Sequence, residues 1–438
     1  MMNTLTCPLP TFRRLLQALA EDRGRTVFIR VGIRHAPPDH EWLVRDLISS
    51  PPDTPAPHQG PVFRVALTAN PPAMPLTHLP SDPSLPGVVG HLYLGHGQWH
   101  GYLWGVVRTD GAIEPLHRLC LVGTGMHQIR NPKFEIRNSN RDRERWSRTM
   151  GALGGEAVWQ RLVGLRVAVV GCGRTGSLVA VTLARLGIRR LTLIDPDIVE
   201  VHNLGEMDAV TDDDLGRPKA EAIVGHLRSL LPHASASLFP IVAPIAQPAA
   251  LAATKGCDVL FCCADNDAAR LATAILSTLY HKVLVDIGTG VHFTVPDDPI
   301  RNPQFEIRNR IMGADVRLIL PGDGCLLCQG NLTDYAQAVD DLCNHRPPAG
   351  LQVGQRNWRR QRAGSLRTLN QLAAALGVQM LQDLVAERLR TSTWTHVEFD
   401  EVGRLAVEYP PMQQPAGADD CALCAKAGLG DEGLGWTQ

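Results

Sequence analysis

The alternation of apolar and polar positions divides the chain into two parts. From about residue 165 onward, short apolar runs alternate with segments that have the apolar periodicity of a helix. The first run is Val167 to Val170, a helical segment follows over 177–186, and the next run is Leu191 to Ile194. Strands that alternate with helices are typical of an α/β fold with a doubly wound, mostly parallel sheet. We therefore predict such a fold for this part of the chain.

The first 125 residues have a different pattern. Apolar, β-rich runs at 26–33, 62–67, 99–107 and 118–122 are separated by proline-dense loops, and one helical segment covers 11–21. Such runs, bounded by turn-forming residues, are typical of strands. We predict a separate α+β domain at 1–125.

A short repeat occurs once in each half of the chain. Residues 130–138 read RNPKFEIRN and residues 301–309 read RNPQFEIRN, so a single position differs. Loops accept insertions at low thermodynamic cost. We interpret the copies as a duplicated insertion in surface loops, the first of them within a linker at 126–144.

The composition narrows the classes of function. Lys and Arg total 43 against 44 Asp and Glu, and a formal charge of -1 gives no field that attracts nucleic acid or an anionic membrane. No apolar run approaches the roughly 18 residues that span a bilayer, and the start MMNTLTCPLPTFRR lacks the apolar centre of a secretory signal. We expect a cytoplasmic protein whose 11 cysteines serve metal binding or thiol chemistry rather than disulfides.

A glycine-rich turn joins the first strand to the helix after it. In the sequence GCGRTG, Gly171 permits a tight turn, Gly173 lets a phosphate approach the backbone, and Gly176 allows close packing of helix on sheet. Asp195 ends the next strand, where a carboxylate can accept hydrogen bonds from ribose hydroxyls. This unit predicts a nucleotide site, and on these residues alone it fits NAD as well as ATP.

Two C-x-x-C pairs lie about ninety residues apart. Cys325 and Cys328 form the first pair, and Cys421 and Cys424 form the second. Four thiolates can close a tetrahedral zinc site that leaves no position open for catalysis. We predict a structural Zn²⁺ here.

The stretches DPDIVEVHNLGEMDAVTDDDLGRPKAEAI and FCCADNDAAR resemble the ThiF/MoeB superfamily, the adenylating relatives of ubiquitin-activating enzymes. The resemblance runs from about residue 145 to 424. It implies a Rossmann-like adenylation domain at 145–438, with a C-terminal segment tethered by zinc. It also implies use of ATP and Mg²⁺ on the C-terminal glycine carboxylate of a ubiquitin-like protein.

The resemblance also assigns roles to single residues. Asp195 corresponds to the ribose-binding acid, Asn203 to the asparagine beside the phosphates, and Lys219 to the lysine that neutralises phosphate charge. Asp265 matches the acid that binds Mg²⁺, and Arg270 follows it at the family spacing. An enzyme that releases pyrophosphate needs a lysine, an arginine and a metal ion to neutralise its charge. A nicotinamide enzyme needs none of these. The set therefore favours ATP over NAD.

The segment Arg145-Trp146-Ser147-Arg148 resembles the family's Arg-aromatic-x-Arg entry segment. In the family, the second arginine reaches the ATP of a neighbouring subunit. The resemblance thus implies that Arg148 has this role and that the protein is a homodimer.

One position departs from the family. The motif Asn-Leu-x-Arg-Gln appears here with Glu206 in place of the arginine that faces the phosphates. Arg174 in the glycine loop, or Arg217 near Lys219, could supply the missing charge. The acid also favours an alternative, a catalytically dead scaffold that binds a ubiquitin-like partner.

Cys343 lies in a polar stretch where activating enzymes of the family carry a crossover loop, here about 335–362. The family's loop cysteine attacks the acyl adenylate, and a thiolate needs an exposed, electropositive setting. Asp340 and Asp341 oppose such a setting. The cations that favour it are His345, Arg346, Arg356, Arg359, Arg360 and Arg362.

The N-terminal part offers less chemistry. His91, His96 and His100 fall across a glycine-rich strand and turn, so their spacing does not converge them on a metal. The segment LTHLPSDPSLPG resembles the JAB/MPN deubiquitinase fold, but it lacks a full His-x-His with the spaced Ser and Asp. The resemblance implies a domain without peptidase activity that serves as an accessory platform for binding or dimerisation.

We predict an enzyme that adenylates a ubiquitin-like protein, captures the acyl group on Cys343 and passes it to a conjugating enzyme. The alternatives are a sulfur-carrier adenylyltransferase of thiamine or molybdopterin synthesis, and an enzyme that adenylates a small molecule or an RNA base. A nicotinamide oxidoreductase leaves Lys219, Asp265 and the cysteine pairs unexplained.

Overall fold

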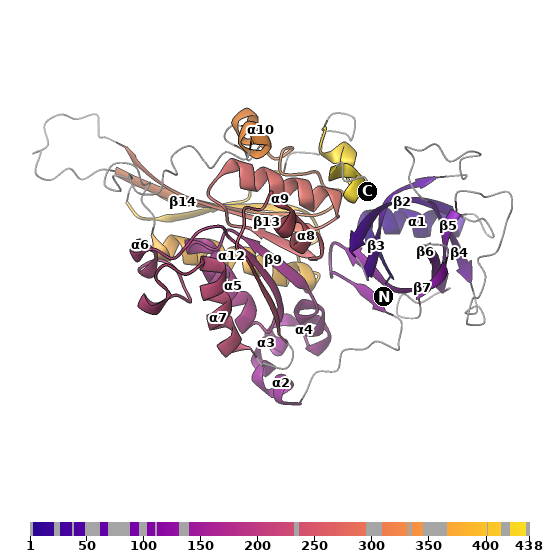
Figure 1. Ribbon diagram of the computed structural model, residues 1–438, viewed down its shortest axis with the longest axis horizontal. Helices are drawn as coiled ribbons and strands as arrows, with labels where there is room; N and C mark the ends of the chain where they lie inside the picture. Colours follow the sequence, from indigo (N-terminus) through magenta and orange to yellow (C-terminus); the bar gives the residue numbers. More distant parts are fainter. Residues whose placement is uncertain are drawn as a thin grey trace, which may run out of the picture.

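The structure is a computed structural model of the 438-residue chain. It describes residues 3–21, 27–36, 39–48, 62–68, 88–95, 103–109, 112–130, 140–231, 236–294, 309–330, 332, 335–344, 366–400, 402–412 and 421–434. Two eight-stranded sheets organise the chain, and each belongs to one half of the sequence (Figure 1).

The first sheet closes on itself. Its order is β1-β3-β2-β4-β5-β6-β7-β8, and β1 also pairs with β7, so the strands from β1 to β7 form a barrel (Figure 1). The strands are β1 (Asn3–Pro8), β2 (Val27–Ala36), β3 (Asp39–Ile48), β4 (Val62–Thr68), β5 (Val88–Gly95), β6 (Leu103–Thr109), β7 (Ala112–Val122) and β8 (Gln128–Arg130). Helix α1 (Leu9–Glu21) buries Phe12, Leu15 and Leu19 against this sheet.

The second sheet is mostly parallel and confirms the predicted fold class. Its order is β11-β10-β9-β12-β13-β14-β15-β16, with parallel pairing from β11 to β13 and antiparallel pairing beyond. The strands are β9 (Arg166–Val170), β10 (Arg190–Ile194), β11 (Ser237–Ile241), β12 (Val259–Cys262), β13 (Val283–Thr294), β14 (Asn309–Ile319), β15 (Thr393–Phe399) and β16 (Leu405–Glu408). The parallel strands read as continuous apolar runs because helices cover both faces.

Two apolar clusters separate the layers. One face carries α5 (Arg174–Arg185), α7 (Lys219–Leu230) and α12 (Arg367–Val385), which contact one another or the sheet. The other face carries α8 (Pro248–Lys255) and α9 (Asp267–Leu279), and α10 (Tyr335–Asn344) packs on α9. The doubly wound arrangement places the loops that follow the parallel strands together at one edge of the sheet.

The stretch between the two sheets contains short elements. Helices α2 (Asn140–Arg145), α3 (Ser147–Leu153) and α4 (Glu156–Val163) precede β9. Strand β8 pairs with β7 inside the stretch 126–144, which we expected to be a linker. Both copies of the nine-residue repeat lie almost entirely outside the described residues.

The barrel packs on the amino edge of the second sheet, where the parallel strands begin. Lys282, directly before β13, places its Nζ 3.5 Å from the Glu41 Oε2 of β3. The neighbouring His281 side chain bonds the Val44 carbonyl oxygen through Nε2 at 2.7 Å. The opposite, carboxyl edge therefore faces away from the barrel.

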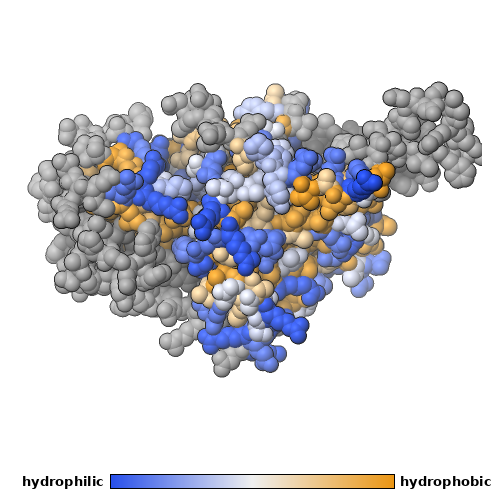
Figure 2. Space-filling view, turned by 180° about the vertical axis from the view of Figure 1, so that it is seen from behind, coloured by the Kyte–Doolittle hydropathy of each residue, from blue (hydrophilic) through white to orange (hydrophobic). Residues whose placement is uncertain are grey.

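Among the described residues, no helix has both the length and the apolar character that crossing a membrane requires. Figure 2 shows hydrophilic and apolar residues interspersed over the described part of the rear face.

Candidate functional site

The glycine loop lies at the carboxyl edge, between β9 and α5. Gly171 has φ +84°, and a Cβ there would lie 2.9 Å from the Ala264 nitrogen. A Cβ at Gly176 would lie 1.8 Å from the Gly171 carbonyl oxygen, whereas Gly173 has open space around it. Gly171 and Gly176 are therefore required by the fold, and Gly173 leaves room above the first turn of α5. A helix N-terminus with room above it favours an anion.

Asp195 ties the loop to the next strand. It is 5% exposed, and its carboxylate accepts hydrogen bonds from the backbone nitrogens of Cys172, at 2.6 Å, and Asp197, at 2.8 Å. Burial raises the pKa of this carboxyl, against the lowering effect of Lys219 and the two amides. The structure thus places Asp195 directly beside the glycine loop.

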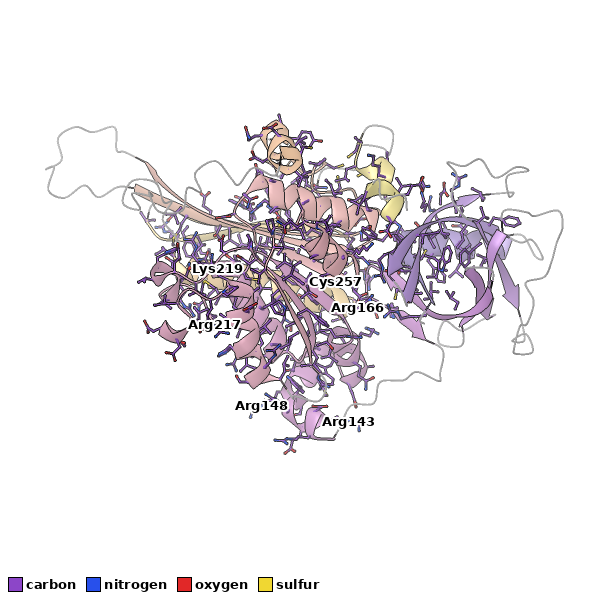
Figure 3. All side chains as sticks on the ribbon, in the orientation of Figure 1. Arg143, Arg148, Arg166, Arg217, Lys219 and Cys257 are labelled. Atoms are coloured by element: carbon purple, nitrogen blue, oxygen red, sulfur yellow. The ribbon has the colours of Figure 1, made fainter. Side chains whose placement is uncertain are left out.

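Lys219 begins α7 and points to the same edge. Its Nζ lies 2.8 Å from the Asp197 Oδ2. Burial alone would lower the pKa of this ammonium, but Asp195, Asp197 and Asp265 together raise it. Asp265, which follows β12, is exposed. The structure therefore brings Asp195, Lys219 and Asp265 together, and Figure 3 shows Lys219 against the end of the sheet.

The side chains of two other predicted site residues, Asn203 and Arg270, bond to groups of the protein itself. Asn203 is buried in α6 (Val201–Leu204), where its Oδ1 accepts from the Glu200 backbone nitrogen at 2.9 Å and caps the helix. Arg270 donates to the carbonyl oxygens of Ala264 and Ile287, each at 3.2 Å, and pairs with Asp286. Arg270 thus holds the end of β12 against β13. The nucleotide contacts predicted for both residues remain predictions.

Glu206 lies within reach of the glycine loop. Its Oε2 is 3.4 Å from Nη1 of Arg174, the first residue of α5. Arg217, the other cation considered for this position, instead pairs with Asp214 at 2.6 Å. The main chain of the same segment is held from α12, because Arg367 donates to the Glu206 carbonyl oxygen at 3.1 Å.

Arg148 lies far from this site within the chain. It is exposed on α3, and Figure 3 shows it well apart from Lys219. A role at the nucleotide therefore requires a second subunit, and it remains a prediction.

Cys343 is not brought to the glycine loop either. It lies near the end of α10, a helix formed by the first part of the stretch that we expected to be a loop. All eleven cysteines fall within the described residues, and Cys343 alone among them is exposed. The helix packs on α9, on the opposite face of the sheet from α5 and α7 (Figure 1). The cations expected to surround it, at 345–362, lie outside the described residues.

The four predicted zinc ligands converge. Cys325 Sγ lies 3.7 Å from Cys328 Sγ and 3.6 Å from Cys421 Sγ, and Cys328 Sγ lies 3.6 Å from Cys424 Sγ. Sulfurs bound to one tetrahedral zinc at ~2.3 Å lie ~3.8 Å apart, so the spacing fits this ion. A hydrogen bond from Cys424 lowers the pKa of the Cys325 thiol to about 5, whereas the same bond raises the pKa of Cys424 and burial raises that of Cys328. The convergence of the four sulfurs is therefore the observation that supports a metal site.

Two acids of this region were not singled out from the sequence. Asp197 is the ion-pair partner of Lys219, and its only sequence signal is its place two positions after Asp195. Asp286 is fully buried beside Arg270, with which it pairs at 3.1 Å. A carboxylate inside an apolar run such as VLVDIG needs a buried cation as its partner. The position of Asp286 in this run was therefore the sequence signal that could have identified it.

Comparison with known proteins shows which family this region resembles. The sequence profile of the ThiF family matches residues 146–346. Over 186 residues the chain is 28% identical to the ATP-dependent ubiquitin transferase-like protein Cap2 of Enterobacter hormaechei subsp. hoffmannii, covering 39% of this chain and 31% of that protein. Over 106 residues it is 36% identical to the SAMP-activating enzyme E1 of Haloferax volcanii, covering 24% and 38%. Over 105 residues it is 34% identical to the molybdopterin-synthase adenylyltransferase of Escherichia coli, covering 24% and 41%.

The matched part spans less than half the length of each of these relatives. Among solved structures, Escherichia coli MccB with ATP superposes with a TM-score of 0.46 at 21% identity, covering 66% of this chain and 75% of that one.

Proposed function

We infer, from the premise that residues 146–346 belong to the ThiF family, that this protein transfers the AMP moiety of ATP to the C-terminal carboxylate of a small protein. The observation that carries this proposal is the position of Lys219. Its buried ammonium lies at the carboxyl edge among Asp195, Asp197 and Asp265, beside the glycine loop. Hydride transfer to a nicotinamide needs no such cation, whereas loss of pyrophosphate does.

The proposed reaction forms one bond and breaks another. A carboxylate oxygen of the carrier attacks the α-phosphorus, and the bond from that phosphorus to the pyrophosphate oxygen breaks. The first turn of α5 and Lys219 stabilise the charge that develops on the phosphates. Asp265 is the exposed carboxylate that would hold Mg²⁺, which would neutralise further phosphate charge.

The carrier is proposed to be a ubiquitin-like protein ending in glycine. In this reading the Cys343 thiolate attacks the acyl carbon, AMP leaves, and the thioester passes to a conjugating enzyme. The similarity to a SAMP-activating enzyme and to a molybdopterin-synthase adenylyltransferase supports the first step. On the second step the relatives divide between ubiquitin transfer and molybdopterin synthesis. The exposure of Cys343 supports the conjugation reading, because a thiol that receives an acyl group must be accessible.

ATP–pyrophosphate exchange tests the proposal. The full chain is incubated with labelled pyrophosphate, ATP, Mg²⁺ and small proteins ending in Gly-Gly. Exchange that depends on the carrier is expected, and Lys219→Met should slow it by roughly 10² to 10³-fold. Arg228→Gln is the matched control, since Arg228 is an exposed cation in the last turn of the same helix.

The outcomes separate the rival functions. Exchange that survives Lys219→Met contradicts the role of the lysine. No exchange with any carrier, together with retained binding of ATP and a carrier, identifies a scaffold, the reading that Glu206 favours. Binding of labelled NAD in place of ATP would overturn the proposal in favour of an oxidoreductase.

A further inference from the structure

The last described segment of the chain, 421–434, begins at the metal site and ends between the two sheets. After Cys424, the Gly428 nitrogen donates to the Thr278 carbonyl oxygen at 3.2 Å and the Gly430 nitrogen to the Leu279 carbonyl oxygen at 3.0 Å. These bonds hold the segment on the end of α9 and the turn before β13. Figure 1 shows this segment, in yellow, beside the barrel.

The same segment also touches the barrel. Gly430 forms a parallel bridge with Ile33 of β2, and a Cβ at Gly32 would lie 2.1 Å from the Gly428 carbonyl oxygen. Strand β2 pairs with β4 over Val27 to Arg30 only, so Gly430 lies on the edge of β2 that β4 leaves uncovered. The segment therefore completes the contact of the barrel with the second sheet.

A buried ion pair anchors the end of this segment. The Asp431 carboxylate lies 2.7 Å from Lys255 Nζ, and the Tyr280 hydroxyl donates to it at 2.5 Å. The side chains of Asp431 and Lys255 are 9% and 8% exposed. Removing the charge of one partner leaves the other buried without its counterion, which is strongly destabilising.

The start of the segment is held by its cysteine sulfurs and by Leu423, which is buried in the apolar cluster around α9. Cys421 and Cys424 meet Cys325 and Cys328, which follow β14, and one ion would join all four. Because such an ion is bound by the folded arrangement, its binding free energy stabilises that arrangement. Without it, the part of the segment before Gly428 has one fixed end instead of two and gains conformational entropy.

We propose that metal occupancy of the four-cysteine site controls how firmly the N-terminal barrel is held on the adenylating domain, with residues 421–434 as the connecting strap. Loss of the ion releases the strap from β2 and exposes the edge of β2 from Val31 to Ala36. The parallel sheet and its carboxyl edge are unaffected, because the barrel lies at the opposite edge. The proposal does not rest on the proposed reaction.

Hydrogen–deuterium exchange on the full chain tests the proposal. Zinc content is measured first, and the ion is then removed from the folded protein with a chelator. Those amides of 31–36 that point away from β3 are expected to exchange at least about tenfold faster, while those of β9 and β12 keep their protection. Zinc added back restores the protection of β2.

Variants of residues 421–434 and of their partners distinguish the effect of the strap from the effect of the metal. Asp431→Asn should speed exchange in 31–36 by a similar factor while zinc content is unchanged, because the buried Lys255 loses its partner. Glu432→Gln, an exposed carboxylate in the same turn, is the matched control and should change neither quantity. Tyr280→Phe, which removes one hydrogen bond to Asp431 and no charge, provides a milder variant if Asp431→Asn unfolds.

Two results would overturn the proposal. In the first, the chelated protein keeps full protection of 31–36, so the metal does not act on the barrel. In the second, neither Asp431→Asn nor Tyr280→Phe alters that protection, so the segment is not what holds the barrel.

Discussion

The guanidinium of Arg174 lies 3.4 Å from the carboxylate of Glu206, and this ion pair joins the first turn of α5 to the segment after α6. The acid that departs from the family motif is therefore next to a cation that the glycine loop supplies. Arg217 is a weaker candidate for the missing charge, because it pairs with Asp214 at 2.6 Å instead of with Glu206. We expect Arg174 to contact the phosphates and Glu206 to orient it.

A double-mutant cycle tests this relationship. Arg174→Gln should slow ATP–pyrophosphate exchange by roughly 10²-fold, and Glu206→Gln by a smaller factor. The double variant should be no slower than Arg174→Gln, because a positioning effect disappears with the residue that it positions. Arg217→Gln is the control and should leave the rate close to that of the parent. Faster exchange in Glu206→Gln, equal in both backgrounds, would show that Glu206 only repels phosphate.

Substitutions in the glycine loop distinguish an effect on stability from an effect on nucleotide binding. A Cβ at Gly176 collides with the Gly171 carbonyl oxygen, so Gly176→Ala should lower the melting temperature, at a cost of about 1–3 kcal/mol for an overpacked site. Gly173 has free space and φ -74° with ψ -147°, near the extended region, so Gly173→Ala should lower the melting temperature much less than Gly176→Ala. If phosphate sits above Gly173, the same substitution should weaken ATP binding, measured by calorimetry, at least about tenfold. Unchanged affinity would place the phosphates elsewhere.

The parallel sheet could be predicted because the residues that indicate each strand are adjacent in the sequence. Strands β9 and β10 are continuous apolar runs, and the glycine loop and Asp195 lie directly at their ends. In the barrel, β3 was not predicted, because it reads DHEWLVRDLI and its charges hide the strand pattern. Glu41 within it is buried and paired with Arg34 and with Lys282, a partner that only the folded chain brings near.

The candidate site also combines residues that could be predicted from the sequence with contacts that only the folded chain shows. Lys219 and Asp265 were assigned from sequence motifs, and the fold brings them together. Asn203 and Arg270 form hydrogen bonds with backbone groups, and the positions of these groups follow from the tertiary structure. The path of residues 421–434 between two domains depends on contacts at large sequence separation, for which a single sequence carries no signal.

Cys343 gives the sharpest test of the second step. Cys343→Ala should abolish an adduct with the carrier that dithiothreitol removes, and it should leave pyrophosphate exchange intact, because adenylation precedes the thiol step. Cys343→Ser should yield, if anything, an oxyester that resists dithiothreitol. Non-reducing gels and exchange assays measure both. A thiol-sensitive adduct that persists in Cys343→Ala would exclude this residue, and a sulfur-carrier reaction would then be the better reading.

The contact between barrel and sheet should weaken in acid in two separable steps. Burial lowers the pKa of His281 to about 4, from an ordinary 6.5. Lys282, fully buried, and Arg45 also lower it, against the raising effects of Glu41 and of the Val44 carbonyl oxygen. The unfolded chain therefore binds a proton at a pH where the folded chain does not, so stability is full above about pH 6.5 and falls as the pH drops toward 4. The loss is up to about 3 kcal/mol.

Glu41 titrates in a lower range. Burial would raise the pKa of its carboxyl, but Lys282 and Arg34 lower it from 4.5 to about 2, so its contribution is lost only as the pH falls from about 4.5 toward 2. Denaturant unfolding between pH 7 and 4.5 thus separates His281 from Glu41, and the difference between the parent and a His281 variant gives the share of His281. His281→Asn suits the positive φ of 50° at this position and cannot gain a proton, so it should flatten the pH dependence in that window even though it loses the Val44 bond. A slope unchanged from the parent would show that other groups carry the acid sensitivity of the interface.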